Sequence, residues 1–287
     1  MLAASLDPPD RSALLRLLDD GFPGFAERLR MAAGLGVDWH ARSIPFTVWE
    51  GGEPVAHVGV LPTRWVAMGE AVEVAHVHAV CTRPDLRGRG LAGRALEAAL
   101  AWCDERLPTQ ILFAAVPDLY RRFGFRCVAE HVFHTMVAGR AGLPPGRGMG
   151  MRRLRPDLAQ DWAILERLLH SRTPVSDVLG AAPDNAMFTL NECETPLFYM
   201  SALDAVVVLE LEGETLDLID VVAPRIPTLD AILAAIPRVI ERVRIHFAPD
   251  RLGVDAVAQP VLQAAALMVR GPFAVEAAAF QVPRPAR

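Results

Sequence analysis

The stretch that most constrains this chain is residues 77–93, VHAVCTRPDLRGRGLAG, in which an apolar strand leads through a proline into a glycine-rich turn. Gly88 and Gly90 lack a Cβ atom, so the backbone can turn tightly there and approach a ligand closely. Apolar residues at helical spacing follow, from residue 91 to about residue 106. The unpaired N–H groups at the start of that helix would face the turn and its arginines. The stretch therefore predicts an anion site of the kind that holds a pyrophosphate.

Two further kinds of glycine-rich loop fit this stretch less well. A kinase-type phosphate loop would carry Lys-Ser or Lys-Thr after its glycines, and neither follows here. A dinucleotide-binding loop would read G-x-G-x-x-G, with an acidic residue at the end of a later strand. This turn reads R-G-R-G-L-A, and no acidic residue stands at the expected place. An ordinary strand-to-helix turn is the structural alternative, so a second motif is needed to choose.

Two motifs together resemble one enzyme family. The turn, Arg87-x-x-Gly90-x-Ala92, is similar to the acyl-CoA-binding signature Q/R-x-x-G-x-G/A of the GNAT (GCN5-related N-acetyltransferase) family. About thirty residues later, the run YRRFGF at residues 120–125 is similar to the family's Y-x-x-x-G-F element. Two motifs in the right order and spacing are more specific than either alone. The resemblance covers residues 45–138 and implies an α+β GNAT acyl-CoA N-acyltransferase fold, with a mixed, mostly antiparallel central sheet flanked by helices.

The resemblance also implies that acetyl-CoA is the co-substrate. In the family, the pantetheine arm pairs with a strand edge where two strands splay apart, and a backbone N–H of that edge polarises the thioester carbonyl. That oxyanion role falls here on residues 80–82. The cofactor-binding residues carried onto this sequence are Val80, Cys81, Thr82, Arg87, Gly88, Arg89, Gly90, Leu91, Ala92, Gly93, Ala115 and Val116. In a regular strand, Cys81 would face away from Val80. No metal is expected, because the pair His76-x-His78 has no further ligand at metal-binding spacing.

Tyr120 is the predicted general acid. By the resemblance it lies beside the sulfur of the thioester. A phenol with a pKa near 10 stays protonated at neutral pH and can donate its proton to the departing CoA thiolate. The structural alternative is that Tyr120 only packs on its short helix, with Phe123 and Phe125 as partners.

His78 is the predicted general base, which an acceptor amine needs because alkylamines are almost fully protonated at neutral pH. His76 lies on the same face of the strand, by the two-residue period of strands. Glu73 and His57 are weaker candidates in the neighbouring hairpin. For a histidine on a strand, a structural hydrogen-bonded role is the alternative.

The chain is expected to divide into two domains. Residues 1–138 would form the catalytic domain, with its last strand at residues 126–137. Residues 139–150 hold five glycines and two prolines in twelve positions, a composition typical of a linker. Residues 151–287 repeat the order strand, strand, helix, strand, with a last strand at residues 265–270, but residues 223–228 contain no glycine. This half is interpreted as a degenerate GNAT-like α+β lobe, with an unrelated α+β domain as the alternative.

Composition narrows the setting in which such a chain works. A length of 287 residues suits two domains, and no apolar run is long enough to cross a membrane. The first residues lack the basic start and apolar segment of a secretory signal. Four scattered cysteines, without disulfide or CxxC spacing, favour a cytoplasmic protein with reduced thiols: Cys81, Cys103, Cys127 and Cys193. A formal charge of −5 argues against nucleic acid as the main partner, and a homo-oligomer is left open.

These observations predict an N-acetyltransferase that moves an acetyl group from acetyl-CoA to a primary amine of a small molecule or peptide. The amine would attack the thioester directly, with Tyr120 as the acid. The alternative function is a non-catalytic acyl-CoA-binding sensor or interaction module, in which the anion site persists without the chemistry. The fold and the donor site do not determine the acceptor.

Overall fold

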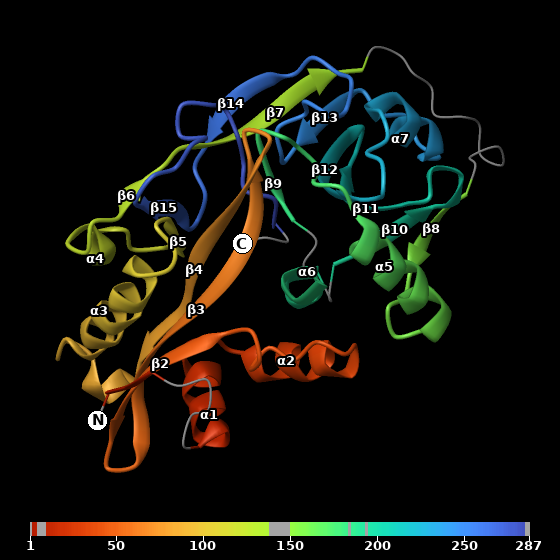
Figure 1. The fold of residues 1–287 in the computed structure, drawn as a ribbon. Coiled ribbons are helices and arrows are strands. Elements are labelled where there is room, and N and C mark those ends of the chain that lie inside the picture. Colours follow the sequence, from red (N-terminus) through yellow and green to blue (C-terminus); the bar gives the residue numbers. More distant parts are fainter. Residues whose placement is uncertain (1, 5–9, 138–149, 183–184, 193–194, 285–287) are drawn as a thin grey trace. The chain divides into compact units, whose positions relative to one another are not determined.

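The computed structural model describes residues 2–4, 10–137, 150–182, 185–192 and 195–284 (Figure 1). Helices alternate with strands that form two sheets, which is the predicted α+β class. Contacts divide the chain into two compact units, each built from separate stretches of sequence. The first unit comprises residues 1–63, 73–128 and 264–273, and the second comprises residues 64–72, 129–263 and 274–287.

The first sheet contains the strand that leads into the glycine turn. Across the sheet, the strands are β1 (Leu2–Ala4), β2 (Ile44–Glu50), β3 (Glu53–Ala67), β4 (Glu70–Thr82), β5 (Gln110–Ala114), β15 (Ala266–Arg270) and β6 (Arg126–Cys127), with β9 (Leu179–Ala181) on the far end of β3. The helical segments of this half are α1 (Arg11–Gly21), α2 (Phe25–Gly34), η1 (Pro84–Leu86), α3 (Leu91–Asp104) and α4 (Asp118–Arg121). β4 and β5 are parallel, with α3 as the crossover between them.

The core of the first unit lies between α3 and the sheet. The apolar stripe of α3 is buried and consists of Leu91, Ala95, Leu96, Ala99, Leu100 and Cys103. It packs against Phe46 and Val48 of β2, Val58 of β3 and Val77 of β4. Because these apolar residues recur at helical spacing, one face of α3 packs against the sheet. This packing holds the first turn of α3 at the end of β4.

The second sheet lies in the second unit. Its strands, in order across the sheet, are β14 (Val257–Val261), β7 (Glu130–Met136), β13 (Arg242–Ile245), β12 (Thr215–Val222), β11 (Ala205–Glu212), β10 (Leu197–Met200) and β8 (Met151–Leu154). The helical segments are α5 (Ala159–Ser171), α6 (Asn185–Glu192), η2 (Ser201–Leu203) and α7 (Leu229–Ala235). β12 and β13 are parallel, and α7 crosses between them.

Helices cover both faces of this sheet because β11 and β12 carry apolar residues on both sides. On one face, Ile232 and Leu233 of α7 pack with the odd-numbered residues of β11, such as Val207. On the other face, Leu168 of α5 packs with the even-numbered residues, such as Val208. The continuous apolar run at the start of β11, Ala205–Leu209, is typical of a strand buried on both faces.

The two halves of the sequence exchange their last strands, contrary to the expectation from the sequence. β7 was expected to close the first sheet, but it pairs with β13 and β14 in the second sheet. β15 was expected in the second half, but it lies antiparallel to β5 and β6 in the first sheet. The sequence places a strand at each segment, but the partner of each strand depends on which sheet edge is free. The expected linker lies outside the described residues except for Gly150.

The hairpin of β3 and β4 is long, and β3 runs unbroken from Glu53 to Ala67. Its far end, with the start of β4, belongs to the second unit, where β9 pairs with Trp65–Ala67 of β3. The strand that carries the predicted base is therefore one arm of a hairpin that contributes to both units.

Candidate active site

The glycine turn adopts the geometry that its sequence predicts. Gly88 and Gly90 have φ angles of +78° and +74°, in the left-handed region that residues with a Cβ avoid. Gly90 is the N-cap of α3, and the first helical bond runs from the Arg94 N–H to the Gly90 carbonyl at 3.1 Å. The N–H groups of residues 91–93 precede that bond, so the helix start offers donors and its dipole to an anion.

Three arginines surround the helix start without a carboxylate partner among the described residues. The turn supplies Arg87, whose Nε lies 3.4 Å from the Thr82 carbonyl, and Arg89. The third, Arg122, was not among the predicted site residues. Its guanidinium stacks on the Phe123 ring at 4.7 Å, and a Cβ atom on Gly93 would lie 3.0 Å from its Nη2. The arginine run beside Tyr120 was the signal in the sequence that could have identified it.

β4 and β5 part from each other beside this turn. Their parallel pairing joins Ala75 and His76 to Gln110 and Ile111. β4 then continues to Thr82 without further pairing to β5. Residues 78–82 are half-buried, so one edge of this stretch is open within the unit. A strand edge with free N–H and C=O groups can pair with an extended amide-bearing ligand, as the pantetheine arm is.

Ala79 interrupts the regular strand at this point. Its φ angle is +51°, an uncommon value for a residue with a Cβ. The placement of Cys81 on the face opposite Val80 assumed that side chains alternate regularly between the two faces of the strand. That alternation therefore does not continue past Ala79. Cys81 is half-buried, and a Cβ atom on Gly21 of α1 would lie 3.0 Å from its own Cβ. Burial raises the pKa of this thiol to about 12, so it is protonated at neutral pH.

The remaining predicted contacts lie after the end of β5 and on the last residues of β4. β5 ends at Ala114, so Ala115 and Val116 belong to the exposed segment that follows, and Val116 is 55% exposed. Val80 packs against the core of the first unit, and Thr82 ends β4. The structure therefore brings the predicted cofactor-binding residues of both strands to the side where β4 and β5 part.

His78 lies on β4 just beyond its pairing with β5, and its ring is held by several contacts. Its Nε2 is 2.9 Å from Ser43 Oγ. The ring of Trp39 meets it edge-on at 4.9 Å between centroids, and the ring of His76 is 6.2 Å away. Burial lowers the pKa of His78 well below its ordinary value, with smaller contributions from His76 and His57. His78 is therefore neutral at neutral pH and can accept a proton.

His57 and His76 are more deeply buried than His78. His57 Nδ1 bonds to Thr47 Oγ1 at 2.9 Å, and burial lowers the pKa of His57 to about 3. Burial also lowers the pKa of His76 to about 4, and its Nδ1 has no hydrogen-bond partner among the described residues. His76 instead meets the Phe113 ring at 5.7 Å. These two histidines are core residues, which leaves His78 as the more accessible base.

The burial of His57 and His76 predicts that the folded protein loses stability as the pH falls. In the unfolded chain, His57 and His76 bind protons as the pH falls below about 6.5. In the folded chain His76 stays neutral until about pH 4 and His57 until about pH 3. The unfolded state then binds more protons, so the free energy of unfolding falls by about 1.4 kcal/mol per pH unit for each titrating histidine. Urea unfolding at pH 7, 6 and 5 measures this slope. His57→Gln should remove one histidine's share, and an unchanged slope would contradict the assignment.

Tyr120 lies on α4, six residues after the end of β5. Its ring is 6.3 Å from the Phe125 ring and packs against the core of the first unit. Burial raises the pKa of Tyr120 above its ordinary value, so the phenol is protonated at neutral pH. Its hydroxyl has no hydrogen-bond partner among the described residues. The ring of Tyr120 therefore packs in the core, while its hydroxyl stays available as a proton donor.

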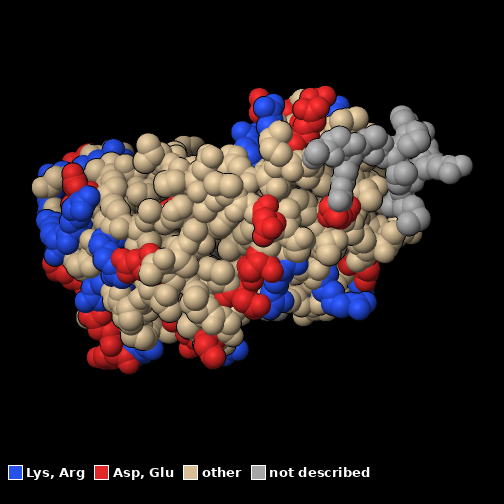
Figure 2. Space-filling view, turned by 90° about the horizontal axis from the view of Figure 1, so that it is seen from above, with Lys and Arg blue, Asp and Glu red and all other residues tan. Residues whose placement is uncertain are grey.

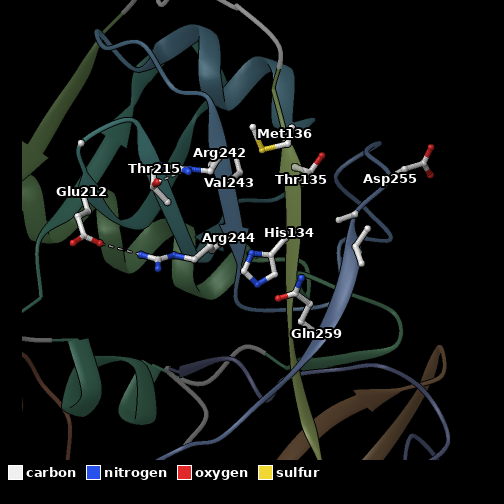
Figure 3. A pocket seen from close by; sticks show the side chains of 13 residues that line it. His134, Thr135, Met136, Glu212, Thr215, Arg242, Val243, Arg244, Asp255 and Gln259 are labelled. Atoms are coloured by element: carbon white, nitrogen blue, oxygen red, sulfur yellow. Dashed lines mark hydrogen bonds and ion pairs between the residues drawn. The ribbon is translucent and has the colours of Figure 1, made fainter.

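A large cavity lies in the second unit and was not predicted from the sequence. It has a volume of about 940 Å³ and opens over β12, β13, β7 and β14 (Figure 3). Arg242 lies 3.3 Å from Thr215 Oγ1, and Arg244 pairs with Glu212 at 3.4 Å. A neighbouring cavity of about 580 Å³ shares His134, Arg244 and Gln259 with it. Alternating polar residues on β12 and β13 were the signal for this polar sheet face.

The surface carries both signs of charge. On the face drawn in Figure 2, arginines and acidic side chains are interspersed among uncharged residues. The sequence contains 29 arginines, 34 acidic residues and no lysine. Among the described residues, the helices are too short or too polar to cross a membrane.

Comparison with known proteins assigns the fold. Residues 11–128 match the family model described as an acetyltransferase (GNAT) domain. A GCN5-related N-acetyltransferase from Kribbella flavida is 20% identical, with 94% of this chain and 71% of that chain covered at a TM-score of 0.57. Eis1 from Mycobacterium abscessus is 15% identical, with 94% and 73% covered at a TM-score of 0.53. No curated protein matches the sequence.

A third solved structure has the same architecture. It is a conserved protein of unknown function from Enterococcus faecalis, 12% identical, with 91% of this chain and 69% of that chain covered at a TM-score of 0.58. At these identities the structures establish the fold, and the matched model establishes the family of the first domain. The predicted fold class is confirmed. This chain therefore carries, in residues 11–128, a domain of the GNAT acetyltransferase family.

Proposed function

We propose that the protein is an N-acetyltransferase that moves an acetyl group from acetyl-CoA to a primary amine. The observation that carries the proposal is the helix start at Gly90, with free N–H groups and three arginines that make no ion pair with a described carboxylate. A site with this charge suits the pyrophosphate of CoA. The open edge of β4 beside it suits the pantetheine arm, and an N–H of residues 80–82 would polarise the thioester carbonyl.

The chemistry needs an acid and a base on the reacting atoms. Tyr120 is protonated at neutral pH and its hydroxyl is not engaged with the described residues, so it can donate to the departing thiolate. His78 is neutral at neutral pH, so it can take the proton that the amine loses on attack. A weak base suffices there, because the nitrogen becomes strongly acidic once its bond to the carbonyl carbon forms.

A label-transfer assay tests the proposed function directly. The sequence contains no lysine, so apart from its N-terminus the protein offers no primary amine of its own for self-acetylation. Radioactive acetyl-CoA, a panel of small amines and peptides, and detection of free CoA thiol would report transfer to the added acceptor. Release of CoA that depends on an amine supports the proposal. Tight binding of acetyl-CoA without transfer to any amine would favour the sensor alternative instead.

We further propose that the second half is a GNAT-like lobe without a cofactor site. Its β12, α7 and β13 repeat the parallel crossover of β4, α3 and β5. The start of α7, however, is closed by the protein itself. The Leu229 N–H donates to the Leu252 carbonyl at 2.9 Å, and the Ala231 N–H donates to Thr228 Oγ1 at 3.3 Å. These bonds use the N–H groups that an anion would need.

The end of β12 is occupied as well. The Thr173 N–H donates to the Ala223 carbonyl at 2.9 Å. Arg172 reaches the fully buried carboxylate of Asp220 at 2.7 Å. The chain segment that contains these residues thus uses the backbone where a pantetheine arm would have to pair.

This arrangement predicts one CoA site per chain. Isothermal titration of the full chain with acetyl-CoA should give a stoichiometry of one, because among the described residues the start of α3 keeps its donors free, whereas the start of α7 does not. Gly90→Trp should weaken that single binding event by about 10²-fold or more. A second binding event that survives Gly90→Trp would contradict the degenerate assignment.

A further inference from the structure

A hydrogen bond links His78 to a residue that was not predicted to belong to the site. Ser43 Oγ lies 2.9 Å from His78 Nε2, although the two residues are 35 positions apart. Ser43 is the residue before β2 and is 7% exposed, whereas His78 is half-buried on β4. The sheet therefore places a buried hydroxyl against the imidazole of the proposed base.

Two further residues, Trp39 and Gly59, restrict the orientation of the His78 ring. The Trp39 ring meets the imidazole edge-on at 4.9 Å. Gly59 of β3 lies directly under it, because a Cβ atom at that position would be 2.5 Å from both Cε1 and Nε2. A contact that short cannot be accommodated without moving the ring. The absence of a side chain at position 59 is thus a condition for the observed position of His78.

The two ring nitrogens differ in their surroundings. Nε2 bonds to Ser43, and Nδ1 has no hydrogen-bond partner among the described residues. We infer that Ser43 is the positioning residue for His78. Ser43 accepts the Nε2–H, which fixes the tautomer whose Nδ1 lone pair is available to the acceptor amine. This inference rests on the proposed function.

The proton balance of the reaction follows from this arrangement. The amine nitrogen attacks the thioester carbon, the C–N bond forms, and the C–S bond breaks. The proton from nitrogen goes to His78 Nδ1, and the Tyr120 proton goes to the CoA sulfur. The products are the amide and free CoA thiol, and the two side chains return to their starting states by exchange with solvent. The other titratable groups that face His78 are His76 on β4 and His57 on β3, and burial keeps both neutral at pH 7.

Substitution of Ser43 tests this role. Ser43→Ala should slow single-turnover transfer to an alkylamine about tenfold, because the loss of one orienting hydrogen bond corresponds to that factor. Ser43→Thr keeps the hydroxyl and should restore most of the rate. The affinity for acetyl-CoA should not change in either variant.

A second acceptor separates positioning of a base from a structural role. Once it is bonded to the carbonyl carbon, the nitrogen of an aromatic amine is more acidic than that of an alkylamine, so it loses its proton with less help from a base. Ser43→Ala should therefore slow transfer to the alkylamine more than transfer to the aromatic amine. Equal losses with both acceptors, or no loss with either, would overturn the inference.

Gly59→Ala tests the position of the His78 ring in a protein whose Ser43 and His78 are unchanged. Displacement of a reacting group by about 1 Å can lower a rate about a hundredfold, and a loss of that order is expected here. Gly34→Ala is the matched control, since its Cβ would meet nothing within 4 Å and Gly34, like Gly59, does not have a positive φ. A Gly59→Ala protein that folds and transfers acetyl at the wild-type rate would contradict the inference.

Nitrogen NMR of the imidazoles gives a readout that does not depend on activity. In protein labelled with ¹⁵N-histidine, His78 is assigned by the signal that His78→Gln removes. The inference expects a neutral ring with its proton on Nε2 in the wild type, and a proton on Nδ1 would refute it. If the wild type transfers acetyl to no amine, the proposed function fails. The NMR result then still decides whether Ser43 holds His78 in this tautomer.

Discussion

Tyr120→Phe is expected to slow single-turnover acetyl transfer by about 10²–10⁴-fold, the usual contribution of a general acid. Acetyl-CoA affinity should stay close to that of the wild type, because the ring keeps its packing against Phe125. The lost hydroxyl has no hydrogen-bond partner among the described residues, so its removal should cost little folding stability. Rapid-quench measurements with enzyme in excess report the chemical step even where product release limits turnover.

Tyr199→Phe provides the matched control for this prediction. Tyr199 is the other of the two tyrosines in the sequence and lies in the second unit, where its hydroxyl donates to Asp204 Oδ1 at 3.0 Å. The same chemical change there should leave the transfer rate unchanged. A Tyr120→Phe protein that matches the wild type in single turnover would remove the acid role and favour the acyl-CoA-binding sensor.

Gly90→Trp is expected to weaken acetyl-CoA binding by about 10²-fold or more. The indole would lie across the N–H groups at the start of α3, and hydrogen bonds to charged groups are worth about 1.5–3 kcal/mol each. In the structure, a Cβ atom on Gly90 meets nothing within 4 Å, so the added side chain does not clash with the folded protein itself. Isothermal titration calorimetry measures the affinity directly.

Gly52→Trp separates ligand blocking from backbone strain. Gly52 has a φ angle of +86° and open space around its Cβ position, much like Gly90, but it lies in the turn between β2 and β3. Both variants should lose similar folding stability, since a non-glycine residue in the left-handed region costs about 1–2 kcal/mol. Only Gly90→Trp should lose affinity. Equal affinities in the two folded variants would show that the cofactor lies elsewhere.

Local features of the candidate site could be predicted from the sequence. The glycine turn, the start of α3 at Leu91 and the apolar stripe of that helix depend on residues within a few positions of one another. Backbone freedom at Gly90 and the period of the apolar residues determine them directly. Tyr120 and His78 were identified by motif and by strand position, and their roles stay predictions until the kinetic tests are made.

Contacts between distant residues could not be predicted in this way. The position of Arg122 over Gly93 depends on how α4 packs near α3, and the regular alternation expected for Cys81 fails because Ala79 has a left-handed φ angle. The bond between Ser43 and His78 needs three adjacent strands in the right register, with a glycine at position 59. Such pairs leave no period or spacing in the sequence.

The exchange of β7 and β15 shows the same limit at the level of the fold. That residues 130–136 and 266–270 are strands follows from local sequence, because β-branched residues such as Val132, Thr135 and Val269 favour extended backbone. The sheet that each strand joins depends instead on tertiary packing. A strand edge must find a hydrogen-bond partner, and several edges of similar composition compete for it. Burial of the whole chain, rather than any local pattern, decides that competition.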